Sequence, residues 1–489
     1  MLDVLAVLAI GLLGGACILS LLNWRLGVPI TLLVGFLQDP LRKLIPGEPV
    51  ALTVLVGLFL VAAFMGALAR KVPLRFAYLH GGNNRLRTPL GIFIFWCLLS
   101  CGIAFAQTGS VTVAGIGLIA YLSPLPAILL AIVYARSANA AITFLQHYLW
   151  MSVLFVSTVY LAYLGFEWRI LDSVGPGLWI YPDTGPAVKL PNGLFRAPEV
   201  AAWHGAAAFC FLVILANTQK GKAYKIIGGA LLLVLFGAIL LTGRRKALME
   251  IMIFVVAYGF FLAWFQHGSA RLARILLIMG FCALAVMSYF DLFADNATEG
   301  FEPYVQRGVS VGGDALQRLK QMTVDSLRWV IAQNGFFGSG AGTGSQGAQH
   351  FGAGSAVVGG AAEGGIGKVL AEMGVPGVAL LIWLGGAFAL HLRRILYFVG
   401  RRDLQLSSLA CGLVAFLFAN AVVFVTAHQV FGDVFVLLIL GWSLGFVLAV
   451  PFIMGKRAVW VQQSGGSATR TAVLPKRYPK MSRSDTFQP

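Results

Sequence analysis

Four arginines stand beside the long hydrophilic stretches of an otherwise apolar chain. They are Arg196, Arg244, Arg245 and Arg328. A guanidinium group stays charged and can bind two phosphate oxygens at once. A donor fixed in this way stabilises the negative charge that develops in a transition state, and one such donor can raise the reaction rate by roughly 10²–10³. We therefore predict an anion-binding site at these residues.

Some of these arginines also have an ordinary structural interpretation. Arg244 and Arg245 follow the tight turn Thr242-Gly243, and long cations at such a place can instead extend to lipid headgroups. Arg328 lies three residues after Asp325 on a predicted short amphipathic helix, which is the spacing of an ion pair on one helix face. Both interpretations stay open on sequence alone.

Two residues are candidates for a general base, which typically contributes roughly 10²–10⁴ in rate. Glu363 precedes an apolar helix, next to glycines that let a substrate approach closely. A carboxylate that interacts with the helix dipole is the alternative interpretation of Glu363. His350 lies in a glycine-rich loop, where a solvated histidine is the alternative.

Four further residues are predicted to line the same cavity. His428 stands at the end of an apolar run, and Glu372 lies about two turns after Glu363. A carboxylate inside a membrane is costly unless it is paired, so we expect Glu372 to lock helices together, with an arginine as its partner. Gly340 and Gly342 belong to the loop 338–354, which we predict forms the lid and floor of the site.

Several kinds of site are not supported by the sequence. The alternating glycines after Gly338 are not followed by Gly-Lys-Ser/Thr, so they do not form a nucleotide-binding loop. There is no Asp-x-Asp pair for a divalent metal, and the six cysteines all fall in apolar segments. We expect no metal, no cofactor, no disulfide and no nucleic-acid partner.

The composition indicates an all-α polytopic membrane protein. Of the 489 residues, 58% are hydrophobic and only 11% are charged, and the mean hydropathy is +0.83. Soluble proteins carry about 25% charged residues. We predict about twelve spanning helices in a domain covering 1–455, from apolar runs near 3–22, 50–69, 89–107, 112–134, 141–165, 199–217, 225–242, 247–266, 273–293, 367–390, 405–427 and 431–454. The segment 27–45 contains Pro29, Asp39 and Pro40 and is predicted to be re-entrant or interfacial, with a thirteenth crossing as the alternative.

The distribution of charge predicts the orientation. The 36 Lys and Arg against 19 Asp and Glu give a net charge of +17, and with twelve spans five basic segments fall on one side. Such an excess marks the cytoplasmic side. Both termini are then cytoplasmic, including a basic, disordered tail over 456–489. The long loops 166–198 and 294–366, the latter with short helices, fall on the opposite side.

Three patches occur in order along the outer side of this predicted topology. They are 192–199 (NGLFRAPE), 241–248 (LTGRRKAL), and Arg328-Trp329 followed by 337–343 (FGSGAGT) and 372–377 (EMGVPG). Together they resemble the O-antigen ligase and polysaccharide polymerase family of bacterial envelopes. The motifs cover roughly 190–380, and the number of spans and the placement of loops extend the resemblance to the whole chain.

The resemblance implies a GT-C-type glycosyltransferase of the bacterial inner membrane, with its active site facing the periplasm. Its donor would be a glycan on a polyprenyl diphosphate, transferred with inversion and without metal. Matching residue by residue, Arg196 and either Arg244 or Arg245 would hold the diphosphate. Where ligase-like members carry a His-Asn pair nine residues before the Glu of E-x-G, this chain has Glu363-Gly364, which leaves the base open and favours a polymerase.

The function expected from this resemblance is polymerisation of lipid-linked repeat units into an O-antigen-like chain or exopolysaccharide. Membrane lipids, a chain-length regulator and export machinery are the expected partners. A ligase that transfers glycan to lipid A core or to protein is the first alternative. A transporter of lipid-linked oligosaccharides is the second, although the charges of this chain gather at one face and not at mid-span.

Overall fold

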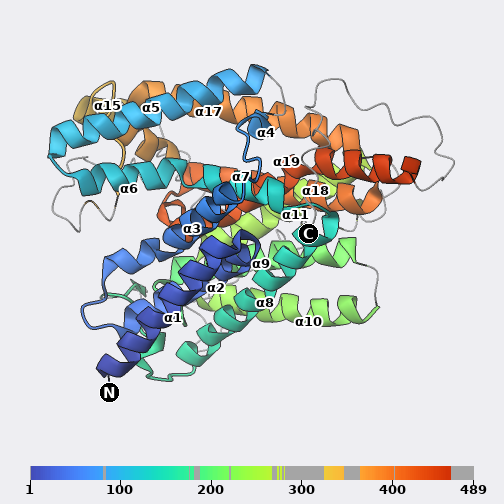
Figure 1. Ribbon diagram of the computed structural model, residues 1–489. Coiled ribbons are helices and arrows are strands. Elements are labelled where there is room, and N and C mark those ends of the chain that lie inside the picture. Colours follow the sequence, from blue (N-terminus) through green and yellow to red (C-terminus); the bar gives the residue numbers. More distant parts are fainter. Residues whose placement is uncertain are drawn as a thin grey trace.

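The computed structural model describes residues 2–80, 84–175, 177–180, 188–219, 222–266, 324–345, 364–400 and 402–463, with a few single residues between 273 and 348. In these ranges the protein is almost entirely helical, and Figure 1 shows the helices as a bundle. The elements are α1 (Leu2–Leu22), α2 (Trp24–Leu44), η1 (Val50–Val54), α3 (Leu55–Ala69), α4 (Ala77–His80), α5 (Asn84–Thr108), α6 (Val111–Leu122), α7 (Pro124–Tyr134), α8 (Ala138–Tyr163), η2 (Arg169–Leu171), β1 (Trp179–Ile180), β2 (Val188–Lys189), α9 (Pro198–Thr218), α10 (Lys222–Leu241), α11 (Arg245–Phe265), α15 (Val324–Asn334), α17 (Gly365–Val399), α18 (Leu404–Thr426), η5 (Val430–Gly432) and α19 (Val434–Gln463).

The protein is a multi-pass membrane protein by the length and composition of its helices. Among the described residues, nine helices or helix pairs are long and apolar enough to cross a membrane. Shorter apolar helices cover Gly11–Leu22 and Ile226–Leu241, and most of the run 273–293 lies outside the described residues. The predicted count of about twelve therefore stays a prediction, whereas the all-α membrane class is confirmed.

Local sequence explains where many helices begin. Ser110, Ser137 and Asp403 are N-caps whose side chains accept hydrogen bonds from backbone N–H groups of α6, α8 and α18. α7 and α9 instead begin with a proline, Pro124 and Pro198, a residue that fits the first turn because no N–H is needed there. Pro124 also divides the predicted span 112–134 into α6 and α7.

α2 covers most of the segment 27–45, which is predicted to be re-entrant or interfacial. It forms one continuous helix of 21 residues from Trp24 to Leu44. Near its start, Gly27 lies against Ser20 at the end of α1 and Ala63 in α3. Near its end, Lys43 donates to the carbonyl of Gly193, which precedes α9. α2 is not among the described helices that are apolar enough to cross a membrane, so the re-entrant or interfacial placement and its alternative, a thirteenth crossing, both stay predictions.

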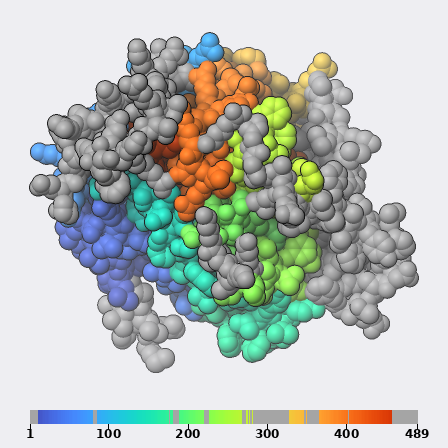
Figure 2. All heavy atoms as spheres, turned by 90° about the vertical axis from the view of Figure 1, so that its right-hand side faces the viewer, coloured from blue at the N-terminus to red at the C-terminus, as the bar shows by residue number. Residues whose placement is uncertain are grey.

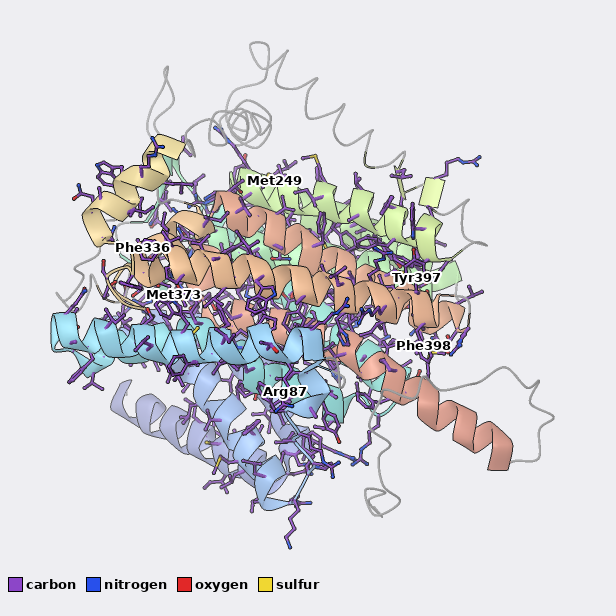
Figure 3. All side chains as sticks on the ribbon, turned by 90° about the horizontal axis from the view of Figure 1, so that it is seen from above. Arg87, Met249, Phe336, Met373, Tyr397 and Phe398 are labelled. Carbon is purple, nitrogen blue, oxygen red and sulfur yellow. The ribbon has the colours of Figure 1, made fainter. Side chains whose placement is uncertain are left out.

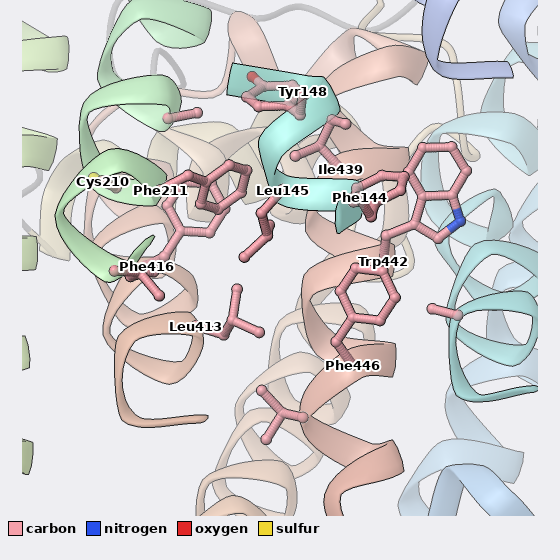
Figure 4. Close-up of a cluster of buried hydrophobic side chains, with 14 of the residues drawn as sticks. Phe144, Leu145, Tyr148, Cys210, Phe211, Leu413, Phe416, Ile439, Trp442 and Phe446 are labelled. Carbon is pink, nitrogen blue, oxygen red and sulfur yellow. The ribbon is translucent and has the colours of Figure 1, made fainter. Parts of the chain in front are cut away.

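The core lies where α8, α9, α18 and α19 meet. Figure 4 shows aromatic and aliphatic side chains of these four helices pointing toward one another. The ring of Phe144 packs edge-on against Trp442 at 4.7 Å, and Phe211 packs against Phe416 at 4.8 Å between centroids. α9 is buried over most of its length, so it forms the central helix of the bundle. Figure 2, viewed onto one end, shows segments from the beginning, middle and end of the chain gathered in one compact body.

Candidate functional site

The turn between α10 and α11 brings Arg244 to the first turn of α9. Gly243 has a φ of +62°, which favours glycine, and the Thr242 hydroxyl donates to the Ile239 carbonyl at 2.6 Å. Arg244 then extends to Glu199, with 2.6 Å between Nη2 and Oε2. Both side chains are largely buried, with exposures of 16% and 21%. The pair fixes the guanidinium in one position.

Next to this ion pair lies a small hollow of about 30 Å³. Its wall combines apolar groups with charged groups of both signs, contributed by α9, α11 and the connection from α18 to α19: Glu199, Ala202, Trp203, Arg244, Lys246, Ala247, Glu250, Val423, Ala427, Gln429, Val430 and Phe431. Segments more than 200 residues apart in sequence thus build one site.

The cations of the hollow are placed to receive an anion. The Nε of Arg244 is buried and has no hydrogen-bond partner among the described residues. A buried donor without a partner costs about 1–3 kcal/mol, and more when it is charged. Lys246 follows two residues later and donates to the Gln429 side chain at 3.4 Å. A ligand with anionic oxygens in the hollow would lie beside the positive charges of Arg244 and Lys246.

The wall of the hollow also contains a buried carboxylate, Glu250, which was not among the site residues predicted from the sequence. Glu250 is 1% exposed, and its Oε1 accepts from Asn420 Nδ2 at 2.9 Å. The Oδ1 of Asn420 in turn accepts from Trp203 Nε1 at 2.8 Å. The available signal was an acidic residue inside an apolar run, because ionisable groups at such positions are usually functional.

Arg196 does not line the hollow. Its Nη1 lies 2.6 Å from Asp433 Oδ2 and 3.4 Å from Asp39 Oδ1, and its backbone N–H donates to Asp39. Burial lowers the pKa of this guanidinium, but Asp433 and Asp39 more than offset it, so the pKa lies above its ordinary value. Two carboxylates already neutralise this charge, which favours a structural role in joining α2, α9 and α19.

The loop that carries Arg196 is held by residues of two helices, α8 and α2. Gly193 has a φ of +55°, and a Cβ there would lie 2.4 Å from Thr158 Oγ1. Thr158 accepts from the N–H of Leu194 at 2.9 Å, and Lys43 donates to the Gly193 carbonyl at 2.7 Å. The motif NGLFRAPE therefore describes a tightly fixed entrance to α9, which places Glu199 in the wall of the hollow.

The glycine-rich loop docks into a break in α17. At Gly374 the backbone leaves helical geometry, with φ 68° and ψ −170°. Pro376 has no N–H, so the Glu372 carbonyl lacks its helical donor, and it accepts instead from Gly340 N–H at 2.9 Å and from Ser100 Oγ at 3.2 Å. Ser339 N–H donates to Ala371, and Val375 N–H donates to the carbonyl of Phe336. Figure 3 shows Phe336 and Met373 at the same end of α17, far from Tyr397.

The predicted roles of Glu372 and the two glycines change in this light. Glu372 is fully buried, but its partners are the Tyr121 hydroxyl at 2.6 Å and the Gly344 N–H at 3.1 Å, and not the expected arginine. Gly340 and Gly342, with φ of +97° and +94°, lie against the backbones of α5 and α6. These three residues hold the loop in place and do not line the hollow.

Three of the remaining candidates are described by the structure but lie outside the wall of the hollow. Arg245 begins α11 but is not part of the hollow's wall, and Arg328 is exposed on α15. His428 is likewise not in the wall, although its neighbours Ala427 and Gln429 are.

The two predicted bases, Glu363 and His350, lie outside the described residues. The start of α17 nevertheless lies near the hollow. Gly365 touches the ring of Phe424, which packs against Phe431 at 5.4 Å.

A comparison with models of protein families found no match to this chain, and a comparison with curated proteins also found none.

Proposed function

We propose that this protein polymerises glycan repeat units carried on a polyprenyl diphosphate, with Arg244 and Lys246 holding the diphosphate in the hollow. The observation that carries the proposal is the placement of two cations, Arg244 and Lys246, in the wall of one hollow, with the Arg244 guanidinium already oriented by Glu199. A diphosphate offers several anionic oxygens to such donors. The resemblance in sequence motifs supplies the class of donor.

The reaction requires little beyond positioning and charge neutralisation. A polyprenyl diphosphate is a good leaving group, and cations that neutralise it lower the barrier without metal. Apolar wall residues such as Val430 and Phe431 suit the lipid-like portion of the donor next to the headgroup. Three of the four charged residues of the hollow, Glu199, Arg244 and Lys246, stand at helix ends, which fits a site at the membrane surface.

The orientation we propose has the hollow on the periplasmic side. The basic residues after α3 and at the end of α17 mark the opposite, cytoplasmic end. If α2 crosses the membrane, those basic loops keep their side and only the N-terminal end of α1 changes, to the periplasm. Asp3 is the only charged residue before Arg25, so this placement agrees with the positive-inside rule.

The first experiment measures binding of undecaprenyl diphosphate to the purified protein in nanodiscs. We expect Arg244→Ala to weaken binding by at least tenfold, and Arg244→Lys to restore it only in part because the forked donor is lost. Glu167→Gln, an exposed carboxylate on the loop after α8, is the control and should bind normally. Unchanged binding by correctly folded Arg244→Ala would remove the anion site.

The second experiment supplies proteoliposomes with a polyprenyl-diphosphate-linked repeat unit isolated from the source bacterium. A ladder of products without another acceptor supports the polymerase. Product that appears only after core lipid is added indicates a ligase. Movement of the lipid-linked unit across the bilayer without bond formation indicates a transporter, and both of these outcomes contradict polymerisation.

A further inference from the structure

Glu250 has the features of a residue that meets a ligand. It lies in the wall of the hollow, yet the residue is almost fully buried, at 1% exposure. Its Oε1 has one partner, Asn420, and its Oε2 has no hydrogen-bond partner among the described residues. A buried carboxylate requires compensation for the water it loses. One oxygen is thus fixed, while the other stays available in the hollow.

The surrounding hydrogen bonds determine which way the Asn420 amide faces. The indole Nε1 of Trp203 can only donate, so the atom it contacts at 2.8 Å must be Oδ1. The two N–H groups of Nδ2 then point to the Phe416 carbonyl at 3.0 Å and to Glu250 Oε1 at 2.9 Å. The chain Trp203–Asn420 therefore orients the carboxylate.

We infer that Glu250 is the catalytic base of the hollow and binds the acceptor sugar hydroxyl. This inference rests on the proposed function, because it places the acceptor beside the diphosphate held by Arg244. The hydroxyl oxygen attacks the anomeric carbon and its proton passes to Glu250 Oε2. The bond from the anomeric carbon to the phosphate oxygen breaks, and polyprenyl diphosphate leaves with that electron pair, which yields inversion.

Asn420 and Trp203 are positioning residues in this scheme. Their hydrogen bonds act on Glu250 and not on the substrate: they hold Oε1, so that Oε2 faces the hollow. Glu199 is not suited to the same task, because Oε2 of its carboxylate already lies 2.6 Å from the Arg244 guanidinium. The two carboxylates of the hollow thus have different roles, one orienting the anion site and the other receiving a proton.

The decisive variant is Glu250→Gln, tested with the isolated repeat unit and with undecaprenyl diphosphate as the binding probe. Glutamine keeps the size of the side chain and an oxygen for Asn420, so a purely structural role predicts normal polymerisation. We expect undecaprenyl diphosphate to bind within about twofold of the wild type, and the rate of polymerisation to fall by roughly 10²–10⁴. Glu167→Gln serves again as the control with unchanged activity.

The outcomes separate this inference from the proposed function. Wild-type polymerisation by Glu250→Gln overturns the role of Glu250 and leaves the anion site intact. Loss of undecaprenyl diphosphate binding in Glu250→Gln also overturns it, since the residue would then serve the donor site. Unchanged binding by Arg244→Ala contradicts the proposed function itself.

A measurement on the wild-type protein covers the case in which Glu250→Gln fails to fold. The apolar reagent dicyclohexylcarbodiimide adds to a carboxyl group that it can reach in an apolar environment and leaves a stable N-acylurea. We expect peptide mass spectrometry to locate this adduct on Glu250, and undecaprenyl diphosphate to slow its formation. An unmodified Glu250, with the peptide from α11 fully covered, would contradict access from the hollow.

Discussion

Removing the Tyr121 hydroxyl tests whether the glycine-rich loop is held by a buried carboxylate. Tyr121 on α6 donates to Glu372 Oε2 at 2.6 Å, and the other oxygen of that carboxylate accepts from Gly344 N–H at 3.1 Å. Glu372 is 0% exposed, so Tyr121→Phe leaves part of a charged group without a donor and without water. Hydrogen bonds to charged groups contribute about 1.5–3 kcal/mol.

The chain offers a matched control in Tyr160. Its hydroxyl donates to the Val234 carbonyl at 2.7 Å, at the exposed edge between α8 and α10. This bond has a neutral acceptor, so Tyr160→Phe should cost only about 0.5–1.5 kcal/mol. The two variants remove the same atom and differ in the burial and charge of the partner.

Hydrogen exchange of the protein in nanodiscs is the suitable assay, because it reports local opening of the loop. A loss of about 2 kcal/mol corresponds to roughly a 30-fold increase in exchange at residues 338–345, since about 1.4 kcal/mol is a factor of ten. Tyr160→Phe should leave that loop unchanged. Equal exchange in both variants would refute the assignment of Glu372 as the anchor of the loop.

Three further predictions concern the other fixed points of the structure. Gly342→Ala should release the loop, because a Cβ there would lie 2.3 Å from the Val113 carbonyl oxygen. The control is Gly109→Ala, which has the same positive φ but no atom within 4 Å of the added Cβ, and it should lower the stability by only about 1–3 kcal/mol. Limited proteolysis of the two variants compares the release of the loop. Asp433→Ala should be less stable than Asp433→Asn by about 1 kcal/mol in the free energy of unfolding, because asparagine can still cap α19 by accepting from the N–H of Phe435, which lies 2.7 Å from Asp433 Oδ1. Unfolding in SDS measures the difference, and equal midpoints would contradict the cap. A tag placed before α1 should be removed by protease added to intact spheroplasts while a C-terminal tag is protected, and protection of both tags would contradict the crossing by α2.

Much of the architecture could be predicted from sequence because the membrane makes strong local demands. Runs of about 20 apolar residues must form helices, since a backbone in lipid has no other way to satisfy its hydrogen bonds. The run 199–217 and α9, Pro198–Thr218, differ by one residue at each end. The segment 27–45 forms the continuous helix α2 although its prolines and Asp39 lower its hydropathy, and its re-entrant or interfacial placement stays a prediction. In the folded protein, ion pairing of Asp39 with Arg196 compensates the buried charge.

The assignment of roles to charged residues was less accurate, for a physical reason. Whether an arginine binds a ligand depends on the carboxylates that other helices bring to it, and sequence spacing does not reveal them. Arg196 meets Asp39 and Asp433, from positions 157 residues before it and 237 residues after it. Arg244 meets only one carboxylate, Glu199, and keeps a buried nitrogen without a partner among the described residues.

The membrane class, most helix positions, the basic end of the bundle and the turn that presents Arg244 could all be predicted from the order of the residues. These follow from short-range properties: apolar length, proline and glycine geometry, and the side on which cations gather. Only the tertiary structure decided which charges neutralise one another and which face a hollow. It joined Glu250 to Asn420 across 170 residues and docked the glycine-rich loop on the carbonyl left free by Pro376. Long-range packing sets these contacts, because a buried polar group is tolerated only where another part of the chain supplies its partner.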